Sequence, residues 1–424
     1  MKKTKKETLI TSFALFSMFF GAGNLIFPPF LGKNAADTWH WVAFGFFITA
    51  VFIPILGILA HARLQGTMYD FGKKVSPTFS FIYCFVVYVI SVALPAPRTA
   101  SVTHEMAIQP YFETDSLFTS SIYFALVLAF VMNRSKILTL IGRFLTPLII
   151  VILLSIICIG IFSSNTISTP TIFNTPFVSG LFEGYQTFDA IGAVVIGGVL
   201  VISMNFNKNT SFQEKKELIT TSGLIAGLGL LIIYAGLIYN GAIFGSTFPK
   251  EASRSEILSS LSSQTLGNIG TTLLSVLVAL ACFTTAVGII TGTSDYFKSL
   301  FNNSEKAYTI TAIIGCVLGI VIGQFNVQFI VDIAFPALMF IYPITIILIL
   351  LNLLPTKLAT PTMFKAVVLV TFVFSIPDFL QFFIDKESLV RIQNIIPFSK
   401  DNLGWVLPAL LTFLVIRFSS KKEA

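Results

Sequence analysis

The chemistry that this sequence offers begins in a short run of residues near the N-terminus. Residues 21–29 read GAGNLIFPP, so two Gly, one Asn and two Pro interrupt an otherwise apolar segment. Gly weakens a helix by about 1 kcal/mol and Pro by about 3 kcal/mol relative to Ala, and Pro also removes a backbone donor. The run therefore predicts that a helix unwinds near residues 21–25. An unwound turn presents free amides to an anion and free carbonyls to a cation.

The same run also allows a simpler interpretation. In a Pro-kinked membrane helix the two Gly residues would serve only the close packing of neighbouring helices. Asn24 favours a binding role, because a buried amide side chain needs hydrogen-bond partners of its own.

Two ionisable residues, Arg98 and Asp189, lie within other apolar segments. An ionised side chain near the centre of a membrane helix costs about 2.5–3.5 kcal/mol, so residues of this kind commonly have a function. Asp189 predicts a contact with a cation or a substrate amine, or a structural bond to another polar group. Arg98 predicts a structural or gating partnership with Asp189, with Glu105 or with a helix-end carbonyl.

The elements that must position these groups are membrane helices. Of the 424 residues, 55% are hydrophobic and only 11% are charged, whereas a soluble domain has about 25% charged residues. So few charges cannot cover a soluble protein of this length, which excludes a soluble enzyme, a disordered chain and a nucleic-acid binder. The four Cys lie in separate apolar runs, without the spacing of a metal site or a disulfide framework.

A helix needs about 20 mostly apolar residues to cross a bilayer, and twelve segments meet this need. We predict an all-α polytopic membrane protein that forms a single transmembrane domain over residues 1–424. The predicted spans are residues 8–34, 41–62, 78–107, 116–132, 143–163, 185–204, 217–244, 267–293, 307–324, 327–354, 362–384 and 402–418. Two Pro residues and Arg98 lie inside the third span, which is expected to bend or break there.

The distribution of Lys and Arg predicts the orientation of these spans. With both termini in the cytoplasm, the basic residues on the outer side are Lys33, Lys250, Arg254, Lys386, Arg391 and Lys400. All other Lys and Arg except Arg98 fall on the inner side, as the positive-inside rule requires. An N-terminal signal peptide is the alternative for the first apolar run. Its removal would leave an odd number of spans and would spoil the charge bias.

The first and sixth spans both carry interruptions, and they are five spans apart. A five-plus-five repeat would therefore pair them, and because five is odd the second copy would be inverted in the membrane. The first repeat would cover about residues 8–163 and the second about residues 185–354. Two additional helices would follow at about residues 362–418.

Three motifs resemble those of a known family. Residues 13–29 read FALFSMFFGAGNLIFPP, residues 97–100 read PRTA and residues 184–189 read GYQTFD. They resemble the branched-chain amino acid:cation symporter family, the type II branched-chain amino acid carriers. The resemblance extends over most of the chain. It implies the LeuT-like fold of the amino acid-polyamine-organocation superfamily, with broken spans 1 and 6.

The resemblance also implies two sets of site residues. The substrate carboxylate would bind the amides of Ala22 and Gly23, and the predicted substrate site comprises Ala22, Gly23, Asn24, Phe188, Asp189 and Gly192. A sodium ion would bind backbone oxygens of the first span and oxygens of the eighth, namely those of Ser17, Phe20, Ala281, Thr284 and Thr285. The alternative for the two Thr hydroxyls is a bond back to a carbonyl of their own helix.

The implied function is secondary active uptake of leucine, isoleucine and valine, driven by symport of sodium or protons through alternating access. The expected location is the cytoplasmic membrane of a bacterium, with lipid, the amino acid and Na⁺ as partners. We expect no enzymatic activity and no cofactor beyond the coupling ion. No nucleic acid or obligatory protein partner is expected either, and no P-loop indicates ATP-driven transport. The alternative is a transporter of the same fold for another neutral amino acid or a nucleobase.

Overall fold

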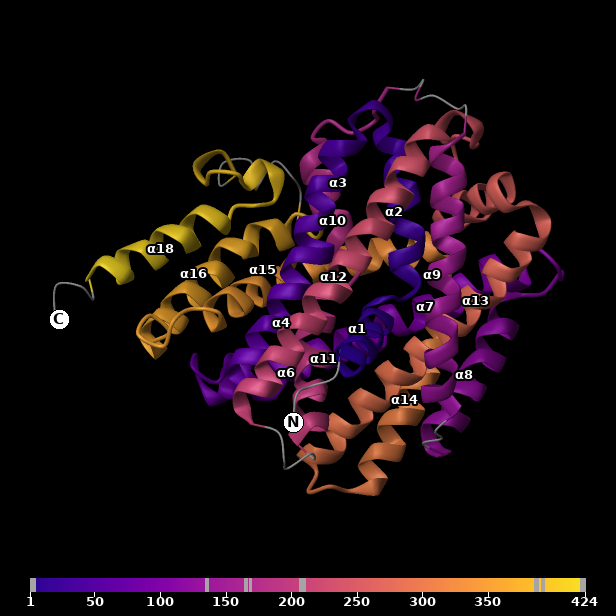
Figure 1. Ribbon diagram of the computed structural model, residues 1–424. Helices are drawn as coiled ribbons and strands as arrows, with labels where there is room; N and C mark the ends of the chain where they lie inside the picture. Colours follow the sequence, from indigo (N-terminus) through magenta and orange to yellow (C-terminus); the bar gives the residue numbers. More distant parts are fainter. Residues whose placement is uncertain are drawn as a thin grey trace. The chain divides into compact units, whose positions relative to one another are not determined.

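The computed structural model describes residues 5–133, 137–163, 167, 170–205, 211–384, 389 and 393–419, and these residues form helices and no strands (Figure 1). The helices are α1 (Lys5–Phe19), α2 (Ala22–Ala35), α3 (Trp39–Phe47), α4 (Ile53–Leu64), α5 (Met68–Gly72), α6 (Pro77–Ala93), α7 (Pro95–Thr103), α8 (Ser116–Asn133), α9 (Ile137–Ile161), α10 (Pro176–Tyr185), α11 (Asp189–Asn205), α12 (Phe212–Ile243), α13 (Arg254–Leu300), α14 (Glu305–Gly323), α15 (Val327–Asn352), α16 (Pro361–Leu380) and α18 (Val406–Ser419). Two π-helical turns, Ile48–Phe52 and His104–Ile108, continue α3 and α7.

The all-α prediction is confirmed, and helices occupy every predicted span. Within the described residues, eight helical stretches are long and apolar enough to cross a membrane. Two shorter apolar helices, Leu145–Ile161 and Val406–Ser419, lie in the predicted fifth and twelfth spans. The number of crossings stays a prediction.

The first span is broken, but the break begins one residue earlier than the sequence predicts. Only Phe20 and Gly21 are non-helical, and the helix resumes at Ala22, so the prediction of unwinding over residues 21–25 is wrong in its extent. The physical reason lies in Asn24, whose side-chain oxygen accepts the Gly21 N–H at 3.1 Å and so caps the new helix.

The third span bends as predicted, and the sixth begins earlier than predicted. Leu94 separates α6 from α7, directly before Pro95. The sixth span is two helices, α10 and α11, and α10 lies in the segment that the sequence analysis leaves as a connection. Composition explains the error, because the residues of α10 include Pro, Ser, two Gly and Glu and lack a continuous apolar run.

A further helical segment precedes the predicted eighth span. Residues 254–266 are helical and join the rest of α13 at Gly267, where φ is +70°. Glycine adopts this left-handed conformation without a Cβ clash, so it provides the kink. The segment begins with a capping box, in which the Ser253 side chain accepts from the Glu256 N–H.

The chain divides into two compact units. Unit 1 comprises Met1–Ile48, Tyr88–Thr187 and Ile225–Asp332, and unit 2 comprises Thr49–Val87, Phe188–Leu224 and Ile333–Ala424. The predicted single domain and inverted repeat stay predictions.

Unit 1 has a core in which aromatic side chains of α8 pack against α7, α13 and α14. A second contact in this unit holds α10 against α3. A Cβ at Gly45 would lie 2.0 Å from the Phe177 carbonyl oxygen, and one at Gly180 would lie 2.0 Å from the Val42 carbonyl oxygen. Each helix therefore places a glycine against the other's backbone, which allows a closer approach than larger residues permit.

Unit 2 centres on the packing of α4 against α11, and α16 also packs against α18 (Figure 1). His61 of α4 is fully buried, and its Nε2 lies 2.7 Å from the Val194 carbonyl oxygen of α11. Tyr83 and Thr345 share a buried hydrogen bond of 2.9 Å.

Candidate transport site

A buried side chain, that of Asn24, holds the start of the helix that follows the first break. Asn24 is 1% exposed, and besides capping Gly21 it donates from Nδ2 to the hydroxyl of Tyr234 on α12. Ala22 and Gly23 are the first two residues of α2, and N–H groups in the first turn of a helix have no intrahelical acceptor. The predicted carboxylate-binding amides therefore lie at a helix N-terminus, where the helix dipole is positive.

Arg98 lies beside this helix start. A Cβ at Gly23 would lie 2.8 Å from Arg98 Nη2, and the guanidinium carbon is 5.1 Å from the centre of the Phe27 ring. Arg98 is 4% exposed, so its charge acts in a water-poor environment. The guanidinium of Arg98 and the positive end of the α2 dipole therefore lie next to each other in unit 1.

The second break begins where α10 ends, and Arg98 reaches this end as well. Arg98 Nη1 donates to the backbone carbonyl of Gln186 at 2.8 Å. Of the three partners that the sequence leaves open for Arg98, the helix-end carbonyl is thus confirmed. The N–H groups of Gln186 and Thr187 bond back to Glu183 and Gly184, which tightens the last turn of α10.

The remaining predicted substrate residues belong to unit 2. Phe188 has φ of +63° and is 7% exposed, and Asp189 begins α11 and is 3% exposed. The Gly192 N–H donates to the Phe188 carbonyl at 2.8 Å. Ala22, Gly23 and Asn24 belong to unit 1, so a site that all six residues share stays a prediction.

The five predicted sodium ligands all belong to unit 1. Within this unit, the break in the first span lies next to α13. A Cβ at Gly21 would lie 3.7 Å from the Thr285 hydroxyl oxygen, which places the break next to that side chain. The hydroxyls of Thr284 and Thr285 each donate to the Ala281 carbonyl at 2.9 Å. This is the back-bonded arrangement that the sequence analysis holds as the alternative.

Of the two other predicted sodium ligands, Ser17 lies in α1 and Phe20 is part of the break. Phe20 is buried, and its N–H donates to the Phe16 carbonyl at 2.9 Å. The Ser17 hydroxyl accepts from the Thr146 hydroxyl of α9 at 2.8 Å. The Ser17 hydroxyl therefore holds α1 against α9. The predicted sodium ligand is a different atom of Ser17, its backbone carbonyl oxygen.

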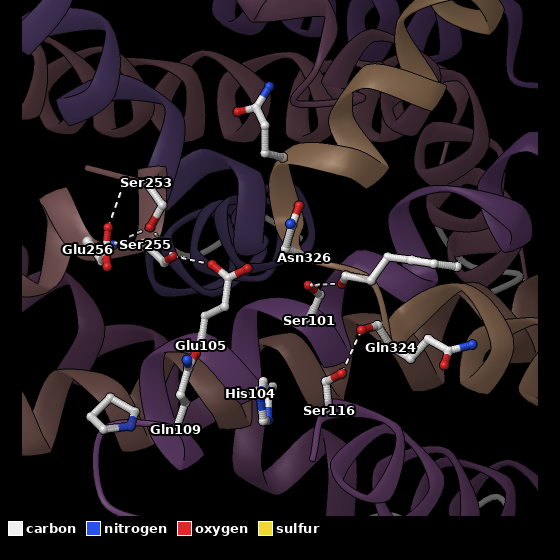
Figure 2. Close-up of a pocket in the computed structure, with 13 residues that line it drawn as sticks. Ser101, His104, Glu105, Gln109, Ser116, Ser253, Ser255, Glu256, Gln324 and Asn326 are labelled. Atoms are coloured by element: carbon white, nitrogen blue, oxygen red, sulfur yellow. Dashed lines mark hydrogen bonds between the residues drawn. The ribbon is translucent and has the colours of Figure 1, made fainter. Parts of the chain in front are cut away.

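The described hydrogen bonds of Glu105 are with Ser255 and Val327, and not with Arg98. Its Oε1 accepts from the Val327 N–H at 2.8 Å, and its Oε2 accepts from the Ser255 hydroxyl. Glu105 and Ser255 line a cavity of about 570 Å³, in which the Glu105 side chain extends between Ser255 and Asn326 (Figure 2). The described contacts of Glu105 thus join the starts of α13 and α15 to the π-helical turn after α7.

An ion pair that the sequence analysis does not predict lies close to this cavity. Arg254, at the start of α13, contacts Glu183 of α10 at 2.7 Å and also donates to Gln328 of α15. Its guanidinium carbon lies 3.9 Å from the centre of the Phe30 ring of α2. Both charges lie in segments between predicted spans, and the 71 positions that separate them in the chain hide the pairing.

Comparison with known structures defines the fold. Mhp1, a nucleobase-cation-symport-1 family transporter solved in a closed conformation with bromovinylhydantoin bound, has a TM-score of 0.59 and 13% identity. The match covers 98% of this chain and 93% of that chain. The fold is therefore that of the LeuT-like membrane transporters, as the sequence resemblance predicts.

The sequence comparisons define the family. The family model described as "Branched-chain amino acid transport protein" matches residues 4–423. The "Branched-chain amino acid permease BraB" of Bacillus subtilis (strain 168) is 30% identical over 420 residues, which is 96% of this chain and 94% of that protein. A putative branched-chain amino acid carrier protein of Staphylococcus aureus (strain bovine RF122 / ET3-1) is 31% identical over 442 residues, which covers 97% of this chain and 96% of that protein. This chain belongs to the branched-chain amino acid transport protein family, and it is a multi-pass membrane transporter of small molecules with bacterial relatives.

Proposed function

We propose that this chain takes up leucine, isoleucine and valine across the cytoplasmic membrane by symport with sodium. Family membership supports a branched-chain amino acid as the substrate, and the fold is one that a cation symporter also has. Both termini would lie in the cytoplasm, and alternating access would expose the site to each side in turn.

The observation that carries the proposal is the positive charge at the start of α2. The amides of Ala22 and Gly23 and the guanidinium of Arg98 meet in a buried place, and all three attract an anion. The carboxylate of an amino acid satisfies this requirement. A neutral nucleobase does not, so the geometry favours an amino acid over a nucleobase as the cargo.

The coupling ion would bind where Gly21 adjoins Thr285. A hydroxyl that donates its hydrogen to its own helix keeps its oxygen lone pairs, and these can face a cation. The Ala281 carbonyl already accepts two hydroxyls, so its participation in the sodium site would require one of them to turn away.

A competition experiment on purified protein tests the substrate class. Radiolabelled leucine is bound in the presence of sodium and is displaced by isoleucine, valine, leucinol or uracil. We expect the three branched-chain amino acids to bind within about a hundredfold of one another, because one methylene is worth only about 1–3 kcal/mol. Leucinol lacks the carboxylate and uracil lacks any fixed charge, so neither should displace leucine. Displacement by uracil at leucine-like concentrations would refute the proposed cargo.

A further inference from the structure

The side chain of Gln186 carries an acceptor that the protein itself does not use. Gln186 is 2% exposed, and its Nε2 donates to the Val331 carbonyl at 3.2 Å. Its Oε1 is buried and has no hydrogen-bond partner within the described residues. Buried polar atoms are nearly always hydrogen-bonded, so a lone acceptor at this depth requires an explanation.

The orientation of this amide follows from its surroundings. If the nitrogen and oxygen exchanged places, two oxygens would face each other across the 3.2 Å that separates Gln186 from Val331. The nitrogen must therefore face Val331, and the oxygen is the atom that remains for a donor.

The backbone of the same residue is held firmly in place. Its carbonyl accepts from Arg98 Nη1 at 2.8 Å, and its N–H donates to the Glu183 carbonyl at 3.1 Å. Gln186 directly follows α10, at the negative end of that helix dipole. The position favours a cationic donor, and half-helix C-terminal ends in transporters meet cations in this way.

We propose that Oε1 of Gln186 accepts a hydrogen bond from the ammonium group of the transported amino acid. The inference rests on the proposed function and adds a specificity residue to it. One acceptor satisfies one N–H of an ammonium group, whereas a sodium ion needs several oxygens to replace its hydration shell. Arg98, which holds the backbone of Gln186, also adjoins the start of α2, so a carboxylate and an ammonium group would be bound by groups that one arginine connects.

The test compares two probes on the purified full-length chain. L-Leucine carries the ammonium group, and 4-methylpentanoate has the same carbon skeleton without it. In the Gln186→Met variant we expect the preference for leucine over 4-methylpentanoate to fall by about 10- to 100-fold, because a hydrogen bond to a charged group is lost. A purely structural role would weaken both probes equally and leave the ratio unchanged, which would overturn the inference.

Two further variants make the result specific. Gln324→Met is the matched control, because Nε2 of Gln324 also donates to a carbonyl, that of Val321 at 2.8 Å, and we expect its ratio to equal that of the wild type. Gln186→Glu keeps an oxygen acceptor, and when its other oxygen is protonated that oxygen donates to the Val331 carbonyl in place of Nε2, so this variant should keep the preference for leucine. If Gln186→Met does not fold, Gln186→Glu decides alone, since loss of the preference there contradicts the inference.

The same measurements distinguish a failure of the role of Gln186 from a failure of the proposed function on which it rests. A wild-type protein that binds no leucine would contradict the proposed function itself. A wild-type protein that binds leucine, together with an unchanged ratio in Gln186→Met, would contradict only the role of Gln186. A variant that shifts the sodium requirement while keeping the ratio would assign the acceptor to the ion and overturn the ammonium contact.

Discussion

At the level of single residues, the hydroxyls of Thr284 and Thr285 can serve their own helix and a bound cation at once. Both donate to the Ala281 carbonyl, and this bond fixes the hydrogen and leaves the oxygen lone pairs for another partner. The back-bonded arrangement and the predicted sodium site are therefore compatible for these two side chains. They conflict only at Ala281, whose carbonyl oxygen already has two hydroxyl donors.

The double variant Thr284→Ala/Thr285→Ala tests this pair. We expect the sodium concentration for half-maximal leucine uptake to rise at least about tenfold, because two neutral oxygen ligands are removed, each comparable to a hydrogen bond to a charged group. Thr371→Ala is the matched control, since Thr371 donates to the Val367 carbonyl at 2.7 Å in α16 and lies outside both predicted ligand sets. A normal sodium response in the double variant would contradict the assignment of the ion to α13.

Single residues also mark the limit of prediction from this sequence. The interruption at residues 21–29 and the buried charge of Arg98 stand out against an apolar background, so both could be identified without a structure. Gln186 could not, because its open acceptor arises from a bond to Val331, which lies 145 positions further along the chain. The Arg254–Glu183 pair is hidden for the same reason.

At the level of elements, broken helices create the helix ends at which we propose that charged groups bind. The break before α2 is confined to two residues because Asn24 caps the helix after it. Gly and Pro content could predict that a break exists, but the exact residues depend on a side-chain bond that Asn24 makes. Apolar runs do not predict α10, because its residues are not apolar throughout, although the helix packs closely on α3.

The close contact of α10 with α3 predicts a strong effect of one methyl group. In Gly180→Ala the new Cβ would meet the Val42 carbonyl oxygen at 2.0 Å, so the helices must move apart. We expect the free energy of unfolding to fall by about 1–3 kcal/mol, measured by thermal or denaturant unfolding in detergent.

Gly288→Ala provides the control for this substitution. A Cβ at Gly288 meets nothing within 4 Å, and alanine is the better helix former by about 1 kcal/mol. This variant should be as stable as the wild type or slightly more stable. Equal stability of Gly180→Ala and Gly288→Ala would show that the α3–α10 contact does not limit packing.

At the level of the whole molecule, the scarcity of charge predicts a membrane protein, and the family and fold confirm a multi-pass transporter. Its all-α fold class could be predicted because membrane-spanning helices require long apolar runs, and such runs can be identified in the sequence without a structure. The orientation rests on the bias of Lys and Arg alone, and it stays a prediction.

Cysteine labelling of intact cells tests the orientation directly. Lys250 and Lys306 are exposed, before α13 and at the start of α14 respectively. A membrane-impermeant maleimide should label Lys250→Cys in intact cells and should label Lys306→Cys only after permeabilisation. The wild type provides the background, since Cys84, Cys282 and Cys316 are buried and Cys158 lies within a predicted span. The reverse pattern would invert the predicted topology.

The measurement that tests the central claim most directly is uptake of radiolabelled leucine into proteoliposomes that contain the purified chain. We expect accumulation above the external concentration with an inward sodium gradient, and only equilibration when sodium is equal on both sides. Unlabelled isoleucine and valine should abolish this accumulation. Leucine accumulation that is the same with and without the sodium gradient, or no leucine uptake by correctly folded protein, would contradict the account.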